Sequence, residues 1–289
     1  MEWDTAGEEF LARFQSEEAC INYLIQMKWP NGFNCERCSC QNVYLTGTRR
    51  LPLFECANCR YQASPIVGTV MEGSSTPLHK WFLALYLISQ ETLKTNATEL
   101  SRIIQVTYKT GWLILHKIRH AMGEADDAVP LYGHVSVTSA IYGKRPFSHS
   151  FARLPHESPL LIGASMNDQQ EPAYVKIKLV PDQHLKEKSI DRSGMEAFTE
   201  MNIEEGAITD YVVKQFIPLY RRPTYSLFKA SRKWIHTTFR GLGKRHLQAY
   251  LNEFCYRLNM KLRNSTSIFD ELSRLCSFTK PITYQKLIS

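Results

Sequence analysis

Two pairs of cysteines, each pair separated by two residues, constrain this chain more than any other feature. Cys35 and Cys38 form the first pair, and Cys56 and Cys59 follow after seventeen residues. Two turns of this kind can direct four thiolate sulfurs to the corners of a tetrahedron, which is the geometry of a structural zinc site. A disulfide pair or free thiols are the alternatives. The spacing predicts a zinc ribbon in which the metal takes the place of a larger hydrophobic core.

The residues around these pairs support the same interpretation. Short apolar segments at 43–45 and 53–54 predict two strands between the pairs. Four sulfur ligands leave no coordination position for a substrate, so the predicted zinc is structural. Cys40 is interpreted as a packing residue, with a spare ligand as the alternative. Three further cysteines fall on apolar helical faces and are expected to be small core residues: Cys20, Cys255 and Cys276.

Charge is distributed unevenly along the 289 residues, of which 44% are hydrophobic and 22% charged, as in an ordinary folded protein. Residues 1–30 carry a net charge of −4, 31–122 of +5, 123–210 of −6 and 211–289 of +12. Basic blocks attract phosphate backbones, although they can also be solvated surface. The sequence has no run of eighteen apolar residues and begins without a signal peptide. We therefore expect a cytoplasmic, DNA-associated protein that is not in a membrane.

A helix-turn-helix is predicted after the zinc ribbon. Apolar residues at three- and four-residue steps predict a helix from Leu78 to Ile88, and a short helix is expected at 98–104. A tight turn at 105–107 follows, in which Thr107 is placed to cap a longer helix over 108–122. In this geometry Tyr108, Lys109 and Thr110 lead the second helix into the major groove. The alternative is a plain helical hairpin packed on its neighbours.

The hydrophobic period then changes from helical to alternating. An acidic segment at 123–130 is interpreted as a linker, and strands are predicted at 131–141, 160–164, 174–180 and 207–210. A helix is expected at 193–201, before the fourth strand, and further helices follow from Gly243 and from Phe269. Strands that alternate with helices in this order predict an α/β sheet domain. The sequence has no glycine-rich phosphate loop and no pattern typical of a serine hydrolase.

Several segments along the chain form a distinctive set. They are Glu17–Cys20, Trp29–Phe33, Tyr61–Ser64, Gly68–Thr69, Trp81–Phe82, Lys109–Trp112, Lys117–Arg119 and, most specific, Lys244–Phe254. With these residues the chain resembles bacterial insertion-sequence transposases that have an N-terminal zinc ribbon and an ISXO-type DDE core. The likeness runs nearly from end to end.

The resemblance implies a multidomain α+β protein with a zinc ribbon, a helix-turn-helix and an RNase H-like α/β domain. Such a core holds two divalent metal ions on acidic side chains and uses them to cut and join phosphodiester bonds. The expected domains are an N-terminal helix and zinc ribbon (1–74), a helix-turn-helix segment (75–123), a transposase core (130–265), and a C-terminal helix and tail (266–289).

The acidic positions of the resemblance are only partly kept. Thr138 stands where the first carboxylate ligand is expected, and Asp210 keeps the second position. Alignment on Trp234 places Ala230 at the third. A hard divalent cation needs several oxygen ligands, most of them anionic, so one carboxylate is insufficient. The resemblance therefore predicts a catalytic remnant at Asp210, with structural zinc as the cofactor and Mg²⁺ required only if cleavage survives.

The sequence thus predicts a transposase-like DNA-binding protein whose cleavage chemistry is lost. Its expected partner is double-stranded DNA, including the terminal repeats of its element, with self-association or pairing with an intact transposase as further expectations. The alternatives are an active transposase with shifted metal ligands and a transposase-derived regulator or protein-interaction module. Beyond the helix-turn-helix, the residues expected to contact phosphates are Arg232, Lys233, Arg240, Lys244 and Arg245.

Overall fold

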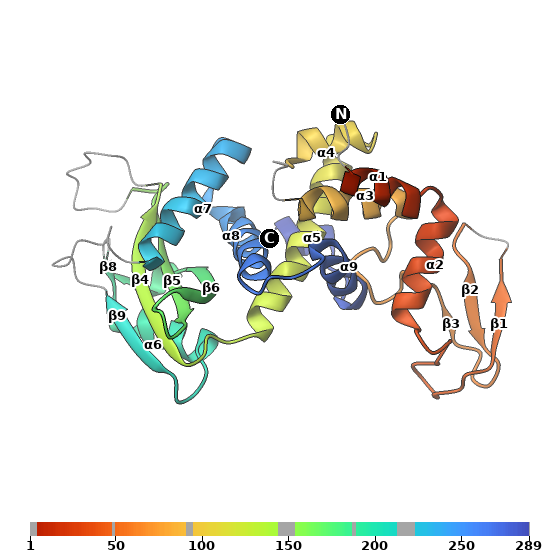
Figure 1. Cartoon of the computed structure of the whole chain (residues 1–289), viewed down its shortest axis with the longest axis horizontal. Helices are drawn as coiled ribbons and strands as arrows, with labels where there is room; N and C mark the ends of the chain where they lie inside the picture. The colour runs from red at the N-terminus through yellow and green to blue at the C-terminus, as the bar shows by residue number, and fades with distance from the viewer. Residues whose placement is uncertain are drawn as a thin grey trace. The chain divides into compact units, whose positions relative to one another are not determined.

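The chain divides into two compact units, which are described separately. The computed structural model describes residues 5–47, 50–90, 95–143, 154–186, 189–212 and 223–288 (Figure 1). Residues 1–121 and 267–289 form the first unit, and residues 122–266 form the second. The domain boundary expected between residues 74 and 75 falls inside the first unit. The segment expected as a separate C-terminal tail also belongs largely to this unit.

The first unit combines a small sheet with helices. The sheet is antiparallel in the order β1-β2-β3, with β1 at Val43–Thr46, β2 at Leu53–Cys56 and β3 at Gln62–Ala63. None of the helices in the described residues is both long and apolar enough to cross a membrane. The helices of this unit are α1 (Thr5–Arg13), α2 (Glu17–Lys28), α3 (Leu78–Ser89), α4 (Ala97–Ile103), α5 (Tyr108–Ala128, which continues into the second unit), α9 (Ile268–Phe278) and α10 (Tyr284–Ile288).

An aromatic cluster joins the two ends of the chain in this unit. Phe269 of α9 packs edge-on against Phe10 of α1 and against Phe14, with ring centroids 5.4 Å apart in both pairs. Phe14 in turn stacks on Phe82 of α3 at 5.0 Å. Aromatic contacts of this kind add to the stability gained by burying the rings. The C-terminal helix α9 therefore completes the core of the N-terminal unit.

The second unit is built on a four-stranded sheet in the order β6-β5-β4-β9. The first three strands in sequence are antiparallel neighbours, and β9 pairs with β4 in parallel. These elements confirm the four strands predicted between residues 131 and 210 and the helix predicted at 193–201. The elements are β4 (His134–Tyr142), β5 (Ser158–Met166), β6 (Pro172–Leu179), a 3₁₀ turn (Asp182–His184), the short hairpin β7 (Leu185–Lys186) and β8 (Ser189–Ile190), α6 (Arg192–Asn202), β9 (Ile208–Val212), α7 (Pro223–Phe239) and α8 (Lys244–Leu262).

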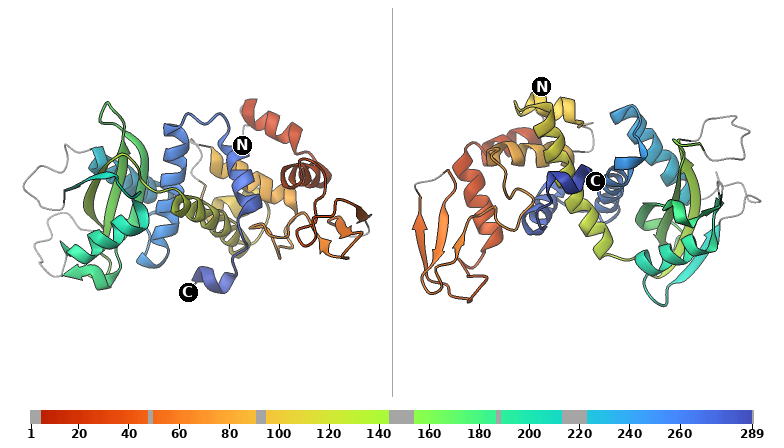
Figure 2. Two further views of the ribbon diagram at one scale, coloured as in Figure 1. Left: turned by 90° about the horizontal axis from the view of Figure 1, so that it is seen from below. Right: turned by 180° about the vertical axis from the view of Figure 1, so that it is seen from behind.

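Helices cover both faces of this sheet. Even-numbered residues of β4, such as Ala140 and Tyr142, belong to the core beneath α7 and α8. Odd-numbered residues, such as Val135 and Val137, belong to the core that contains Phe198 of α6. Figure 2 shows the two helices α7 and α8 on one side of the sheet and α6 on the other. The alternation of side chains along a strand thus assigns each residue of β4 to one face.

The acidic segment at 123–130, which the sequence predicted to be a linker, begins beside the boundary between the two units and is mostly helical. Helix α5 continues through it to Ala128. Asp126 is buried and lies 2.6 Å from the ammonium of Lys178 and 3.6 Å from that of Lys176, both on β6. Burial opposes the charge on Lys178, but the nearby carboxylate of Asp126 raises its pKa. These long-range partners explain why an acidic run without obvious periodicity is helical.

Candidate functional site

The four cysteines of the two CxxC pairs meet at one point. Their sulfur atoms all lie within 4.8 Å of one another, and both Cys35–Cys59 and Cys38–Cys56 approach to 3.5 Å. A zinc ion bound tetrahedrally at about 2.3 Å requires sulfur atoms about 3.8 Å apart. The donor set and its spacing therefore fit a structural zinc ion, as the sequence predicted.

Local backbone geometry prepares this site. Each pair closes a similar turn, in which the amide of Ser39 donates to the Cys35 carbonyl and the amide of Arg60 donates to the Cys56 carbonyl. Ser39 and Arg60 both adopt positive φ angles, of 57° and 58°. The amide of Cys59 donates to the sulfur of Cys56 and lowers its pKa, which favours the thiolate that binds metal. Cys40 is not part of the four-sulfur cluster.

Helices α4 and α5 approach closely, as the predicted helix-turn-helix requires. Asn96 accepts the amide of Glu99 and caps α4, while the hydroxyl of Thr107 accepts the amide of Thr110 at the start of α5. A Cβ atom at Gly111 would lie 3.2 Å from the carbonyl oxygen of Ala97, so glycine permits the close approach. These contacts agree with the predicted cap at Thr107. The helix-turn-helix function itself remains a prediction.

The residues expected to lead α5 into a groove are accessible. Tyr108 is 58% exposed, and Lys109 is also exposed. The ammonium of Lys109 lies 5.0 Å from the ring centroid of Tyr284 on α10. Further along α5, Lys117 is buried and donates a hydrogen bond to the carbonyl of Glu72. Only the first turn of α5, and not its whole length, thus offers cationic side chains to a ligand.

Thr138 lies at the centre of the larger sheet, on the face covered by α7. It is fully buried on β4, and its hydroxyl oxygen is 2.6 Å from the hydroxyl oxygen of Thr224 on α7. One hydroxyl donates a hydrogen bond to the other, so two neutral side chains are paired at this buried position.

Asp210 lies on the neighbouring strand and on the same face. It pairs with Ser136 in the parallel register of β4 and β9. Two residues along a strand span about 6.6 Å, so the fold does bring Asp210 near the position of Thr138. The Asp210 side chain is 64% exposed, and its carboxylate is 3.2 Å from the Nε2 of His134. The fold therefore brings together the first two predicted positions, but only one is acidic.

Ala230, the third predicted position, is exposed on α7. Thr224, six residues earlier on the same helix, is the residue that contacts Thr138. Six residues of helix span about 9 Å, so the two positions are well separated. Sequence reasoning did not identify Thr224, because it predicted no helix over Pro223–Phe239. The apolar face of α7, formed by Phe228, Ile235 and their neighbours, is the signal that could have placed the helix.

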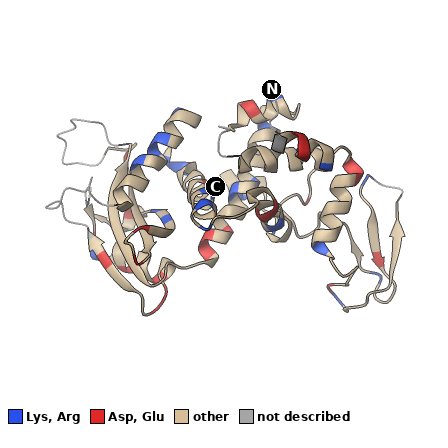
Figure 3. Ribbon diagram, in the orientation of Figure 1, with Lys and Arg blue, Asp and Glu red and all other residues tan. Residues whose placement is uncertain are grey.

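The predicted phosphate-contacting residues lie on or near α7 and α8. Arg232, Lys233, Arg240 and Arg245 are all exposed. Lys244 is also exposed, but its ammonium is 2.6 Å from the carboxylate of Asp182. Figure 3 shows the Lys and Arg positions recurring along α7, whereas acidic positions lie elsewhere in the second unit. This part of the chain therefore carries positive charge that the described carboxylates only partly neutralise.

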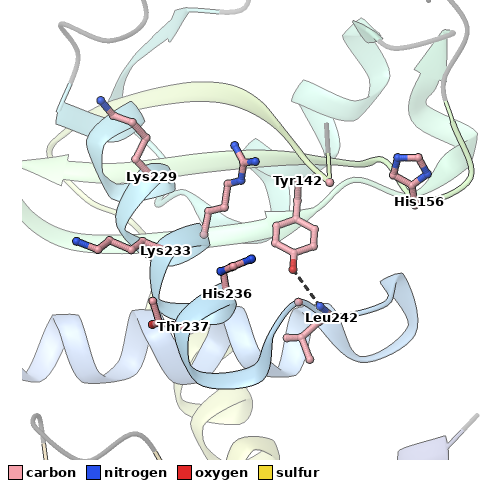
Figure 4. A pocket seen from close by; sticks show the side chains of 10 residues that line it. Tyr142, His156, Lys229, Lys233, His236, Thr237 and Leu242 are labelled. Carbon is pink, nitrogen blue, oxygen red and sulfur yellow. Dashed lines mark hydrogen bonds between the residues drawn. The ribbon is translucent and has the colours of Figure 1, made fainter. Parts of the chain in front are cut away.

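Sequence reasoning also missed a pocket in the second unit. It lies between the end of β4, the exposed face of α7 and the loop at 241–242 (Figure 4). Tyr142, Arg232 and His236 are among its lining residues. No motif marks it, because its walls come from segments about one hundred residues apart.

Comparison with known proteins identifies the N-terminal part of the chain. Residues 15–62 match the family described as the transposase zinc-ribbon domain. The chain is also similar to an uncharacterised protein in transposable element ISH50 of Halobacterium salinarum, with 34% identity over 110 residues. That match covers 38% of this chain and 37% of the relative. No solved structure matches the chain.

Proposed function

We propose that this chain, which carries a transposase zinc ribbon and is related to an insertion-sequence protein, is a DNA-binding protein that no longer cuts DNA. The proposal assigns the zinc ribbon and the α4–α5 pair to DNA recognition. It assigns the second unit to an RNase H-like fold of the ISXO-type DDE group. Three antiparallel strands followed by a parallel fourth strand, with helices on both faces, support that assignment.

The observation that carries the loss of cleavage is the Thr138–Thr224 pair. In a two-metal site, carboxylates at the strand centre and on a facing helix hold the ions that activate the attacking oxygen. Here a threonine on β4 faces a threonine on α7, with the oxygens 2.6 Å apart. Neutral hydroxyls cannot compensate the dehydration of Mg²⁺ as carboxylates do.

Asp210 belongs to no group of three or more candidate metal ligands among the residues the structure describes. In those residues the four cysteines are the only group of three or more candidate ligands close enough to hold a metal ion. The described contact of the Asp210 carboxylate is with His134. An exposed Asp beside an imidazole at a sheet edge is an ordinary surface interaction. These contacts support loss of the metal pair and argue against shifted ligands.

The charge of the chain supports DNA as the partner. The net charge is +7, and residues 211–289 alone contribute +12. Exposed cations at the start of α5, on α7 and on α8 offer contacts to phosphates, and such contacts release counterions. A module that binds only proteins does not require this excess of positive charge.

Duplex DNA binding measured against salt tests the proposal. Fluorescence anisotropy with a labelled duplex should give an affinity that falls linearly with salt on logarithmic axes. Replacing Lys109 or Arg240 by alanine should weaken binding and reduce the slope by about one each. The control is Arg192→Ala on α6, where an exposed arginine pairs with Glu196 in an acidic region. Salt-insensitive binding, or none, would refute DNA binding and favour the interaction module.

A further inference from the structure

The pocket beside α7 is lined by an excess of positively charged side chains. Its ten lining residues include three permanent cations, Lys229, Arg232 and Lys233, and two imidazoles, His156 and His236, but no carboxylate. Its volume is about 530 Å³, within the range of small-molecule sites. All of its walls belong to the second unit.

None of the three cations forms an ion pair with a carboxylate in the part of the chain that the structure describes. Lys244 nearby differs, since it is paired with Asp182. Lys229, Arg232 and Lys233 follow the i, i+3, i+4 spacing, which places them on one side of α7. Like charges at this spacing destabilise a helix, so an anion in the pocket would relieve the repulsion.

Among the three cations, Arg232 is the one whose charge acts on the Tyr142 hydroxyl. Burial raises the pKa of this hydroxyl, and the positive charge of Arg232 acts in the opposite direction. The Tyr142 hydroxyl accepts a hydrogen bond of 3.1 Å from the amide of Leu242, fixing the loop to the end of β4. In Figure 4 the Lys229 and Lys233 side chains extend from α7 away from Tyr142, so they form the rim.

The opposite wall is shaped by a glycine. Gly143 has a φ of +81°, and a Cβ atom there would lie 2.4 Å from the carbonyl oxygen of His156. The absence of a side chain lets the end of β4 approach His156, whose imidazole lines this wall (Figure 4). The pocket is thus lined by a guanidinium, two ammonium groups and two imidazole rings.

The cations and imidazole rings that line the pocket favour a ligand in which a phosphate is joined to a planar ring. A guanidinium can bind two phosphate oxygens at once, and imidazole rings can stack on a base. A free phosphate leaves most of the volume unfilled. We propose that this pocket binds one nucleotide of a DNA strand through its phosphate, without a divalent metal ion. The inference rests on the proposed DNA binding and adds a site that holds a single nucleotide.

The test uses the full-length, zinc-loaded protein and fluorescent 2-aminopurine probes. Binding of the 2-aminopurine deoxynucleoside 5′-monophosphate is compared with that of the nucleoside lacking phosphate, with and without Mg²⁺. The test variant is Arg232→Gln, which removes the charge of an exposed side chain and leaves a polar amide. The matched control is Arg192→Gln on α6, which removes one exposed arginine that does not line the pocket.

The monophosphate should bind at least about tenfold more tightly than the nucleoside, as expected for hydrogen bonds to a charged group. Arg232→Gln should lose about that factor, Arg192→Gln should change little, and Mg²⁺ should have no effect. A 5′-phosphorylated single-stranded oligonucleotide should displace the probe. The inference would be overturned by equal binding of the nucleoside, by an unchanged Arg232→Gln or by an equal loss in Arg192→Gln. Dependence on Mg²⁺, or failure of the oligonucleotide to compete, would overturn it as well. Duplex binding is scored separately, so its failure counts against the proposed function alone.

Discussion

The hydroxyl oxygens of Thr138 and Thr224 lie 2.6 Å apart in the centre of the second unit, where strand β4 meets helix α7. Both side chains are fully buried. A hydroxyl buried without a partner is unfavourable, so each threonine depends on the other. In the proposed function, this pair occupies the place where the family resemblance expects carboxylate ligands.

Replacing one threonine of this pair should be worse than replacing both. Thr138→Val leaves the Thr224 hydroxyl buried without its described partner, at a cost of about 1–3 kcal/mol in the free energy of unfolding. The double variant Thr138→Val/Thr224→Val should recover much of that loss. Urea unfolding of the four proteins measures the coupling between the two residues. Additive losses would mean that the hydrogen bond does not stabilise the fold.

The zinc ribbon should contain one zinc ion per chain, and Cys56→Ser should abolish it. Loss of one thiolate removes a quarter of the coordination, and metal binding supplies much of the folding energy of such small domains. Zinc released by a thiol reagent and counted with a chromogenic chelator measures the stoichiometry. Cys40→Ser is the matched control, because Cys40 lies beside the cluster but outside it. A zinc-free Cys40→Ser, or a zinc-bound Cys56→Ser of normal stability, would contradict the assignment.

The contact of Glu17 on α2 with the start of α3 should stabilise the fold in a pH-dependent way. Its carboxylate accepts the amides of Leu78 and His79 at 2.8 and 3.0 Å, at the start of α3. Burial opposes the charge, but these hydrogen bonds lower the pKa of Glu17 overall. A carboxyl group with a lowered folded-state pKa stabilises the fold above its unfolded pKa, and this stability disappears as the pH falls through the folded value.

Glu17→Gln should therefore lower the free energy of unfolding by about 1–3 kcal/mol at neutral pH. The difference from the unmodified protein should vanish in acid, at pH values below the ordinary Glu range. Thermal unfolding from neutral pH into acid measures this, with Glu18→Gln, an exposed neighbour, as the control. A difference that stays constant with pH would show that the charge of Glu17 is not responsible.

Local patterns predicted some parts of this fold well, and partners distant in the sequence decided the rest. The zinc site followed from spacing alone, since four cysteines in two turns have few other uses. Alternation located β4, β5 and β6, because one side chain in two faces each core. The end of α5 was taken for a linker, since the lysines that neutralise Asp126 lie fifty residues away.

The candidate site was predictable in its strands but not in its helix. Thr138 and Asp210 were placed by the family resemblance on two predicted strands, and the parallel pairing of β4 with β9 brings them to one face. Helix α7 was not predicted, so the contact of Thr138 with Thr224 was not predicted either. The sequence also did not predict that α9 packs against α1 and α3, because contacts between the two ends of a chain leave no local sequence pattern.

The account depends most on the second unit lacking a divalent metal site, and manganese binding tests this directly. Zinc-loaded protein is titrated with Mn²⁺, and the free ion is followed by its electron paramagnetic resonance signal. The account predicts no stoichiometric binding, with any affinity on the order of millimolar or weaker, and no difference for Asp210→Ala. One or two tightly bound Mn²⁺ ions that are lost in Asp210→Ala would contradict it.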